Sequence, residues 1–507
     1  MDPARSGWRH DRLYTVIVAA AMLRALLGLS LGFHPFDDTY ITFRYALNIA
    51  TGHGFVYNWG EPILGTTSPL WAIVLAALHV LHVPLPGGAM AVSLLADTGT
   101  AVFIGATLRR LGFPVAAALG GAILFLCSFD NLALSLSGME TPIFILLVVA
   151  ALHQAAGAML RSACALAALA CLTRPEGLAL IPVLVSLPLL HRPRIGRADV
   201  LAGAGIFLAI TGIWGLFAQL YFGSIVPQSV MAKASTAGSP DLVRFSWINL
   251  LLFFSRGQFG GALLQRTYVQ LNAAWSLLSM IATAHLLATL VRKRDQPSAR
   301  RVVVLLLFPA CFIGGLALSH AFTWFPWYYG PIYPFFATLT ALGAGRVAES
   351  LPGMPDRTWR RAAPIIALLI AAQLIAALII KIPRSDDFWL DGYREAAEPV
   401  PRSESVRIAV PEIGIVGWKL WPARIIDLVG LVTPEAVGVP SDVVVRRLEP
   451  DYIVLRTDDA APFLARVAAE DWFARDYERI LAIRDPFVDR EFHTYKRRSP
   501  STGTSPE

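Results

Sequence analysis

Two adjacent carboxylates open the motif "PFDDTYITFRYALN", which covers residues 35–48. The motif follows an apolar run at 13–33 that is long enough to cross a bilayer. Ionised groups beside a membrane are costly unless they contact water, a cation or a polar substrate. Asp37 and Asp38 are therefore candidate catalytic residues. Because neighbours on a helix point about 100° apart, one can act as a general base while the other orients it, binds a metal or contacts a substrate.

Polar and aromatic residues continue in "GHGFVYNWGEPILGTTSPLW", residues 52–71. Hydrogen-bonding groups beside aromatic faces suit sugars, and an ordered loop resting on the bilayer is the alternative. The candidate substrate-binding residues in and before this loop are Tyr40, Asn58, Glu61, Thr67 and Trp71. His53, a single histidine between glycines, lacks metal-ligand spacing. A divalent cation held by Asp37 or Asp38 stays open, and no other cofactor is expected.

Cations that could hold a phosphate are scarce near these motifs, and the candidates are Arg44, Arg174 and Lys233. Arg174 lies in "TRPEG", where a proline and a glycine interrupt a helix. It either binds an anionic headgroup or pairs with Glu176, itself a candidate substrate contact. Tyr328 of "WYYGPIYP" is a further candidate, although belts of Trp and Tyr commonly anchor a protein at the membrane interface.

The composition is that of a membrane protein. Of the 507 residues, 55% are hydrophobic and 16% are charged, and the mean hydropathy is +0.55. We predict about eleven spans, at 13–33, 88–108, 113–129, 141–157, 162–173, 177–190, 199–221, 269–291, 302–320, 331–348 and 363–382. Within them, Asp97 is expected to pair with Arg24 and link two neighbouring helices.

The distribution of Lys and Arg predicts the topology, because these residues accumulate in cytoplasmic loops. If the apolar segment 68–86 lies on the membrane surface, most basic loop residues share one side with the N-terminus. The acidic pair and the region after 382 then lie outside the cytoplasm, in a multi-pass protein of the cell (inner) membrane. The same arginine excess accounts for the isoelectric point near 9.3 without a nucleic-acid partner.

The chain divides into a transmembrane body, 1–382, and a smaller region after it. The body contains the first outer loop, 34–87. Strand-like runs at 406–410, 423–430, 451–456 and 477–485 alternate with helical patterns at 441–448 and 461–470. This alternation predicts a small extracytoplasmic α/β domain over 383–497, followed by a disordered Ser/Thr/Pro-rich tail at 498–507.

The run "FDDTYITFRYALNIATGHGFVYNWGEPILGTTSPLW" carries a resemblance to a known family, supported by "TRPEG", "VPQSVMAKA", "WYYGPIYP" and "IIDLVGL". It resembles the multi-pass GT-C glycosyltransferases that use polyprenyl-phosphate sugars. Within them it is similar to the group containing the terminal arabinofuranosyltransferase of mycobacterial cell walls. The likeness is strong in the first loop and patchy elsewhere. It implies a mainly α, GT-C-like transmembrane helical bundle with juxtamembrane helices and a C-terminal outward domain.

By this resemblance, the chain would move a pentose or hexose from a polyprenyl-phosphate donor to an envelope glycan, lipid or protein. Asp37 would deprotonate the acceptor, the configuration would invert, and Arg44, Arg174 and Lys233 would stabilise the leaving phosphate. Two other classes compete with this glycosyltransferase: a transporter or flippase of lipid-linked sugars, which needs charges along a path through the membrane, and a non-catalytic envelope scaffold.

Overall fold

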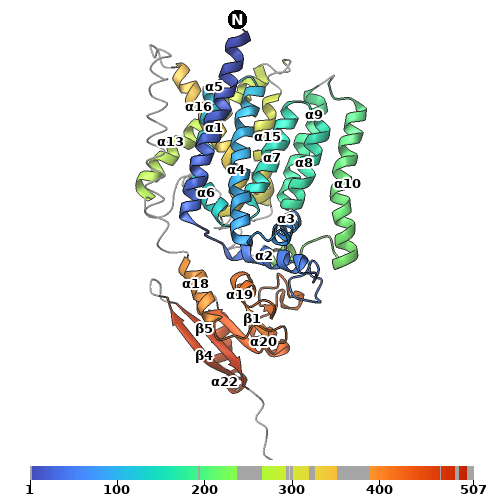
Figure 1. The fold of residues 1–507 in the computed structure, drawn as a ribbon, viewed down its shortest axis with the longest axis vertical. Coiled ribbons are helices and arrows are strands. Elements are labelled where there is room, and N and C mark those ends of the chain that lie inside the picture. The colour runs from blue at the N-terminus through green and yellow to red at the C-terminus, as the bar shows by residue number, and fades with distance from the viewer. Residues whose placement is uncertain are drawn as a thin grey trace, which may run out of the picture. The chain divides into compact units, whose positions relative to one another are not determined.

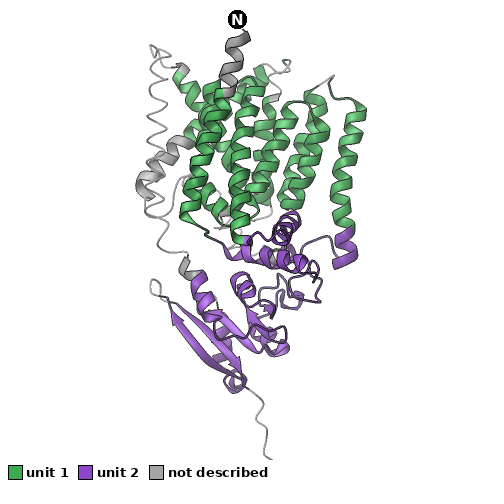
Figure 2. Ribbon diagram, viewed as in Figure 1, with its two compact units in different colours: residues 1–34, 86–216, 237–383 green, residues 35–85, 217–236, 384–507 purple. Residues whose placement is uncertain are grey.

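The computed structural model describes residues 3–191, 194–236, 265–292, 296, 301–318, 326–350, 387–458, 460–468, 470–485 and 490–498. Contacts divide the chain into two compact units (Figure 2). Unit 1 comprises Met1–His34, Pro86–Leu216 and Ala237–Pro383. Unit 2 comprises Pro35–Leu85, Phe217–Thr236 and Arg384–Glu507. The first outer loop therefore belongs to the same unit as the C-terminal region.

Unit 1 is helical (Figure 1). Within it α5 packs on α1 and α16, α13 packs on α16, and α7 packs on α8. Its elements are α1 (Pro3–Leu31), α4 (Leu85–Arg110), α5 (Val115–Leu126), α6 (Phe129–Leu136), α7 (Thr141–Ala156), α8 (Leu160–Thr173), η1 (Pro175–Leu180), α9 (Ile181–Leu190), α10 (Arg197–Phe222), α13 (Gln265–Arg292), η3 (Arg301–Val303), α15 (Val304–Leu318), η4 (Pro326–Tyr328), η5 (Gly330–Ile332) and α16 (Tyr333–Ser350). The end of α10, from Phe217, belongs to unit 2.

Helices occupy every predicted span that the structure describes, but their lengths do not confirm eleven crossings. Three helices, α1 from Arg12, α4 and α10, are long and apolar enough to cross a membrane. The pair α5 and α6, bent by 57°, would make a fourth. Other apolar helices, such as α7, α8 and α15, are shorter, and the span predicted at 363–382 lies outside the described residues.

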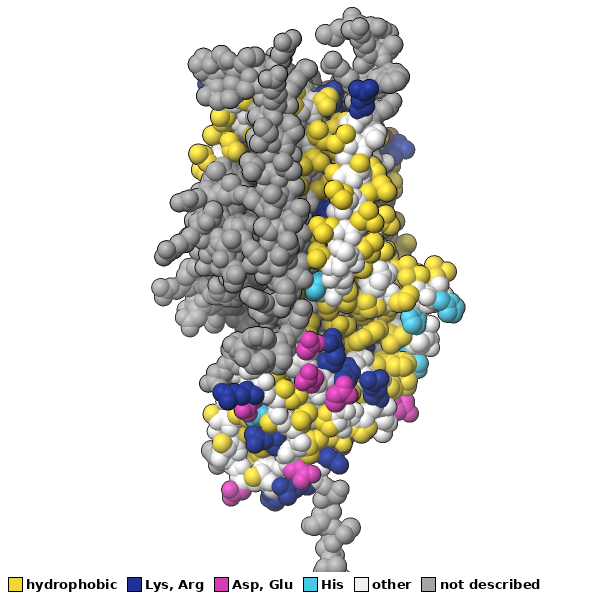
Figure 3. Space-filling model, turned by 60° about the vertical axis from the view of Figure 1, so that its left-hand side comes forward, with side chains coloured by type: hydrophobic (Ala, Val, Ile, Leu, Met, Phe, Trp, Pro, Cys, Tyr) yellow, Lys and Arg dark blue, Asp and Glu magenta, His cyan; other side chains and the backbone are white. Residues whose placement is uncertain are grey.

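The described surface of unit 1 is mostly hydrophobic in the view of Figure 3, whereas charged side chains gather over the C-terminal region of unit 2. Leu23 of α1 and Leu201 of α10 are 70% and 74% exposed. Only 6% of the apolar window of α10 is buried. Apolar side chains left this exposed are stable in hydrocarbon but costly in water, so they fit a membrane-embedded unit.

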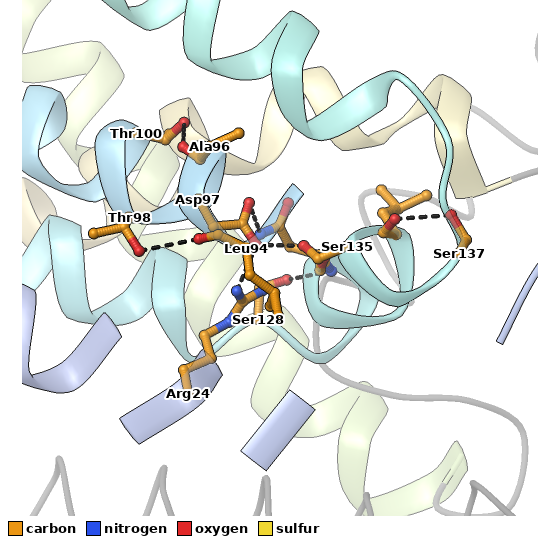
Figure 4. Close-up of polar contacts among 11 residues, drawn as sticks. Arg24, Leu94, Ala96, Asp97, Thr98, Thr100, Ser128, Ser135 and Ser137 are labelled. Atoms are coloured by element: carbon orange, nitrogen blue, oxygen red, sulfur yellow. Dashed lines mark hydrogen bonds and ion pairs between the residues drawn. The ribbon is translucent and has the colours of Figure 1, made fainter. Parts of the chain in front are cut away.

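A buried ion pair links three helices of unit 1, and it confirms the predicted pairing of Arg24 with Asp97 (Figure 4). The two side chains are 7% and 1% exposed. Asn131 and Ser135 of α6 donate to the same carboxylate. Apolar residues of α4 and α6 pack beside the cluster, with Leu94 and Leu132 against α1. The pair therefore fixes α1 to α4 and α6 in apolar surroundings.

Because a buried charge is costly once its partner is lost, Arg24→Met should lower the free energy of unfolding by about 3–5 kcal/mol. The double variant Arg24→Met, Asp97→Leu should recover most of that loss, since no charge remains unpaired. Unfolding of the purified chain in detergent measures both. A double variant as unstable as the single one would show that the pair does not carry this link.

Unit 2 combines helices with a mixed sheet. Its strands run in the order β2-β1-β3-β5-β4, with β1 parallel to β2 and β3 and with β5 antiparallel to β3 and β4. Its elements are α2 (Asp37–Ala50), α3 (Pro69–Val80), α11 (Gln228–Thr236), α18 (Asp387–Ala396), β1 (Arg407–Val410), α19 (Ile413–Lys419), β2 (Arg424–Asp427), η6 (Pro434–Ala436), α20 (Ser441–Leu448), β3 (Tyr452–Arg456), α21 (Ala461–Ala468), α22 (Asp471–Asp476), β4 (Tyr477–Arg484) and β5 (Glu491–Arg497).

The apolar segment predicted at 68–86 forms α3, whose 12 residues are too few to span a bilayer. One face of α3 is buried through Trp71 and Leu75, while Ile73 and Val80 on the other face are 47% and 59% exposed. A short helix with an exposed apolar face suits the predicted position on a membrane surface. The orientation of the chain across the membrane stays a prediction.

Candidate active site

Unit 2 brings together three segments that are far apart in the sequence. The side chain of Asn58 pairs with the backbone of Ile425, accepting from its N–H at 3.0 Å and donating to its C=O at 2.8 Å. Ile425 lies on β2, an edge strand, so the Asn58 amide takes the place of a neighbouring strand. Gln228 of α11 bonds to Leu64 and to Gly430. The first loop, α11 and the C-terminal region therefore form one folded unit.

Asp37 begins α2 and is the acceptor for the first turn of α19. Its two oxygens accept the N–H groups of Gly414 and Ile415 at 2.7 and 2.8 Å. The side chain is 4% exposed. A Cβ on Gly414 would collide with the main chain of Asp37, so glycine at 414 is what lets the two helices approach. Asp37 thus fixes α19 to α2.

Burial raises the pKa of Asp37 to about 7, against the two backbone N–H groups, which lower it. The neighbouring Asp38 charge raises the pKa further. Asp38 lies on the same first turn of α2 and is only partly buried. The two adjacent carboxylates therefore differ in environment, with Asp37 enclosed by backbone donors and Asp38 partly in contact with solvent.

Arg44 is fully buried in unit 2, and all three of its guanidinium nitrogens have protein partners. Nε donates to Tyr57 O at 2.8 Å, Nη1 to Gly417 O, and Nη2 to Ala423 O at 2.6 Å. The guanidinium also lies 4.5 Å from the centre of the Tyr57 ring. These contacts commit Arg44 to backbone carbonyls of the first loop and the C-terminal region, in place of the phosphate that the sequence led us to expect.

The other residues expected to bind substrate in the first loop are placed unequally. Trp71 is 1% exposed and belongs to the core beneath α3, and Tyr40, 6% exposed, packs edge-on against Phe43. Thr67 is partly buried. Glu61 is 29% exposed and pairs with Arg424 at 2.5 Å. Of these side chains, Glu61 and Thr67 retain contact with solvent.

Arg174, Glu176 and Tyr328 lie in unit 1, at the predicted helix break. The helix α8 ends at Thr173, and Arg174 has an extended backbone before η1. Arg174 donates to Glu176 at 2.8 Å and to Glu140 at 2.7 Å, and it lies 5.6 Å from the centre of the Tyr328 ring. Its side chain is 6% exposed. Two carboxylates thus balance this one cation, which favours the pairing alternative over a bound headgroup.

Lys233, the third candidate for binding a phosphate, is placed on α11 of unit 2, but its side chain lies outside the described residues. No group of three or more acidic, His or Cys side chains within the described part of the chain has a geometry that could hold a metal ion. Neither Asp37 nor Asp38 therefore joins such a group there.

Several site-building residues carry weaker sequence signals. Gly417 lets α19 approach the Tyr57 hydroxyl, and with Gly414 it forms a helical i, i+3 spacing in "EIGIVGW". Asp427 of "IIDLVGL" is fully buried and accepts N–H groups from Val429 and Val432 at 2.8 and 3.1 Å. Burial raises the pKa of Asp427 to about 6. The sequence features that could have indicated these residues are the spacing of the two glycines and the position of an acidic residue before a turn.

Comparison with known proteins supports the fold. Residues 392–501 match a family model described as "Domain of unknown function (DUF8728)". No curated protein matches the chain. Among solved structures, ArnT from Cupriavidus metallidurans bound to undecaprenyl phosphate is 14% identical with a TM-score of 0.57, and the match covers 95% of this chain and 97% of that one. ArnT from the same organism in the apo state is 14% identical with a TM-score of 0.56, and the match covers 97% of this chain and 98% of that one.

A mycobacterial arabinofuranosyltransferase, AftD, is 16% identical with a TM-score of 0.48, over 95% of this chain and 41% of that one. The similarity to ArnT extends over nearly the whole of both chains. The chain therefore has a GT-C-like fold, as the first-loop motif predicted.

Replacing Arg44 tests whether this residue is structural. Arg44→Met leaves buried carbonyl oxygens with fewer donors, and we expect a loss of about 3 kcal/mol or more in the free energy of unfolding. Arg44→Lys should not rescue it, because a single ammonium cannot reach carbonyls on three sides. Unfolding and protease resistance of the full chain measure the effect.

The matched control is Arg475→Met, because Arg475 is 73% exposed and pairs only with its neighbour Asp476 among the contacts described. It should change stability little. If the Arg44→Met protein is as stable as the control, the Arg44 guanidinium is not needed for the fold of unit 2, and in the wild-type protein it could bind a ligand.

Asp37 also predicts a pH dependence of stability. Its folded pKa of about 7 lies above the reference value of 3.8, so folding takes up a proton between these two values. The stabilising contribution is complete below pH 3.8 and is lost as the pH rises through 7, by at most about 1.4 kcal/mol per pH unit. The free energies of unfolding of wild type and Asp37→Asn, measured at pH 5, 6, 7 and 8, isolate the contribution of Asp37. Equal slopes in both proteins would contradict it.

Proposed function

We propose that the chain is a membrane glycosyltransferase that uses a polyprenyl-phosphate sugar donor. The observation that carries this proposal is the fold match with ArnT, which covers almost all of both chains and includes a structure with undecaprenyl phosphate bound. The first-loop motif adds support, because its acidic pair, in the first turn of α2, offers a carboxylate of the kind that such a reaction needs. The donor sugar is a pentose or a hexose, and the acceptor is an envelope glycan, lipid or protein on the outer side of the cell membrane.

In this reaction a carboxylate takes the proton from an acceptor hydroxyl, and the hydroxyl oxygen forms a bond to the anomeric carbon of the donor. The bond from that carbon to the phosphate oxygen breaks, and polyprenyl phosphate leaves with the electron pair. Attack opposite the leaving group inverts the configuration. The protein must therefore supply a base and a cation that stabilises the phosphate.

We assign the base to Asp38 and a positioning role to Asp37. A general base must lie within hydrogen-bonding reach of the proton that it removes. Both oxygens of Asp37 already accept backbone N–H groups, and its side chain is 4% exposed. Asp38 lies on the same turn and remains partly exposed. This assignment differs from the resemblance, which implied Asp37 as the base.

Lys233 is the phosphate ligand in this proposal. Arg44 is committed to backbone carbonyls, and Arg174 to two carboxylates. Lys233 belongs to the same compact unit as Asp38, on a helix held to the first loop through Gln228. Glu61 and Thr67 remain the candidate acceptor contacts, because both are only partly buried.

The alternative of a flippase gains no support from the described charges. Arg24 and Asp97, which such a path would use, are paired with each other between helices. The proposal of a transferase therefore rests on the fold match, and this ion pair adds nothing in favour of a transporter.

The base assignment is tested by transfer from radiolabelled lipid-linked sugar with purified protein in liposomes. Asp38→Asn should lower kcat at least about 100-fold, the usual contribution of a general base, with its unfolding midpoint unchanged. Asp37→Asn should mainly lower stability. Full transfer by Asp38→Asn would remove Asp38 from the mechanism, and lipid flipping without any transfer product would overturn the proposed function.

A further inference from the structure

Three aromatic side chains form a cluster at the surface of unit 2, which we call the aromatic platform: His53, Trp59 and Trp421. The His53 ring stacks on Trp59 with centroids 3.8 Å apart and planes within 4°. Trp421 meets Trp59 edge-on at 5.6 Å. His53 is exposed and both tryptophans are partly exposed. None of these three residues is used by the reaction steps above.

The orientation of the platform is fixed from inside the protein by Asn48. Its side-chain oxygen accepts the indole N–H groups of Trp59 and Trp421, each at 2.9 Å. Its amide nitrogen donates to Val56 O and Tyr57 O, so the amide is held by the loop that it supports. Asn48 is fully buried. Aromatic rings held in this way bind a ligand with little further loss of conformational freedom.

Charged groups lie near the platform residues in the sequence. Glu61 is two residues from Trp59, and Arg424 is three residues from Trp421. These two side chains pair with each other at 2.5 Å and are 29% and 52% exposed. An acid and an arginine held side by side can each exchange hydrogen bonds with hydroxyl groups. Unit 2 thus holds aromatic ring faces in fixed orientations and carries a partly exposed ion pair close to them in the sequence.

This combination fits a sugar better than a lipid bilayer. A sugar ring places C–H bonds on an aromatic face and hydroxyl groups at its edge. Aromatic anchors at a membrane interface usually turn their polar ends toward water, whereas both indole N–H groups here point inward to Asn48. Many of the large exposed aliphatic side chains of unit 2 lie on or just after α3, or at the end of α10 and in the segment that follows it: Ile73, Val80, Leu81, Leu220, Ile225, Val226 and Val230.

We infer that the aromatic platform binds a sugar ring of the acceptor glycan, away from the reacting hydroxyl. The inference rests on the proposed function. Asn48 follows Asp38 by ten residues on α2, which places the platform roughly 15 Å along that helix from the base. A site at that distance holds a sugar several units from the one that reacts. Longer acceptors should therefore bind more tightly than short ones.

The experiment is saturation-transfer NMR with the full chain in nanodiscs. The probes are a disaccharide and a hexasaccharide of arabinofuranose and of glucose. We expect a hexasaccharide of one of these sugars to bind more tightly than its disaccharide, and His53→Ala to weaken that binding about three- to tenfold. The matched control is His79→Ala, a partly exposed histidine on α3, which should leave binding unchanged.

Unchanged unfolding midpoints show that His53→Ala acts on binding and not on folding. Equal hexasaccharide binding in His53→Ala and wild type, or no binding of any probe, would overturn the inference. Quenching of Trp59 fluorescence by brominated lipid would also overturn the inference, because it would show that the platform is a membrane anchor. Such quenching is assigned to Trp59 if the Trp59→Phe variant abolishes it. Binding at the platform without any sugar transfer would instead overturn the proposed function and leave the platform standing.

Discussion

The buried guanidinium of Arg44 is the interaction on which unit 2 depends. It joins Tyr57 of the first loop to Gly417 and Ala423, which lie 373 and 379 residues after Arg44 in the sequence. Without it, these backbone carbonyls would be buried with fewer donors and a fully buried positive charge would be lost from between the segments. Two other links join the same segments. Asp37 meets the start of α19, and Asn58 pairs with β2.

This arrangement gives the acidic pair two roles. Because α19 approaches α2 closely enough to enclose Asp37, one carboxylate is spent on holding the C-terminal region. The next residue on the turn points in another direction and keeps solvent contact. The two neighbouring carboxylates on the helix thus contact different surroundings. The enclosed carboxylate fixes the position of the helix turn that carries the partly exposed one.

Regular patterns in the sequence predicted much of the fold. Apolar runs predicted α1, α4 and α10, and β-branched runs predicted β1, β3 and β4 within one residue at each end and β2 with an end three residues too late. The strand β5 was not predicted, because "EFHTYKR" interleaves charged residues with buried Phe492 and Thr494. Helices α18 and α19 were missed as well. In α19 the glycines that allow close packing also lower helix propensity, so tertiary contact decides its structure.

Side-chain partners were harder to predict than elements. The pairing of Arg24 with Asp97 could be predicted, because a charged residue within an apolar span needs a partner of opposite sign. The partners of Arg44 were not, because they are backbone carbonyls, which every residue carries and no sequence pattern marks. From the sequence alone, an arginine near an acidic motif with few other basic residues was therefore predicted to bind phosphate. Its actual environment appears only once the C-terminal region is placed against the first loop.

The two units solve the same problem of buried charge by different means, and this difference explains where function can lie. In unit 1, Arg24 and Arg174 are neutralised by carboxylates from neighbouring helices. Most carbonyls within a helix already accept from their own backbone, and carboxylate side chains are the partners of these two arginines. In unit 2, loops leave carbonyls and N–H groups free, and these hold Arg44, Asp37 and Asp427. Backbone groups therefore hold the buried charged side chains of unit 2, and the carboxylates of Asp38 and Glu61 stay partly exposed.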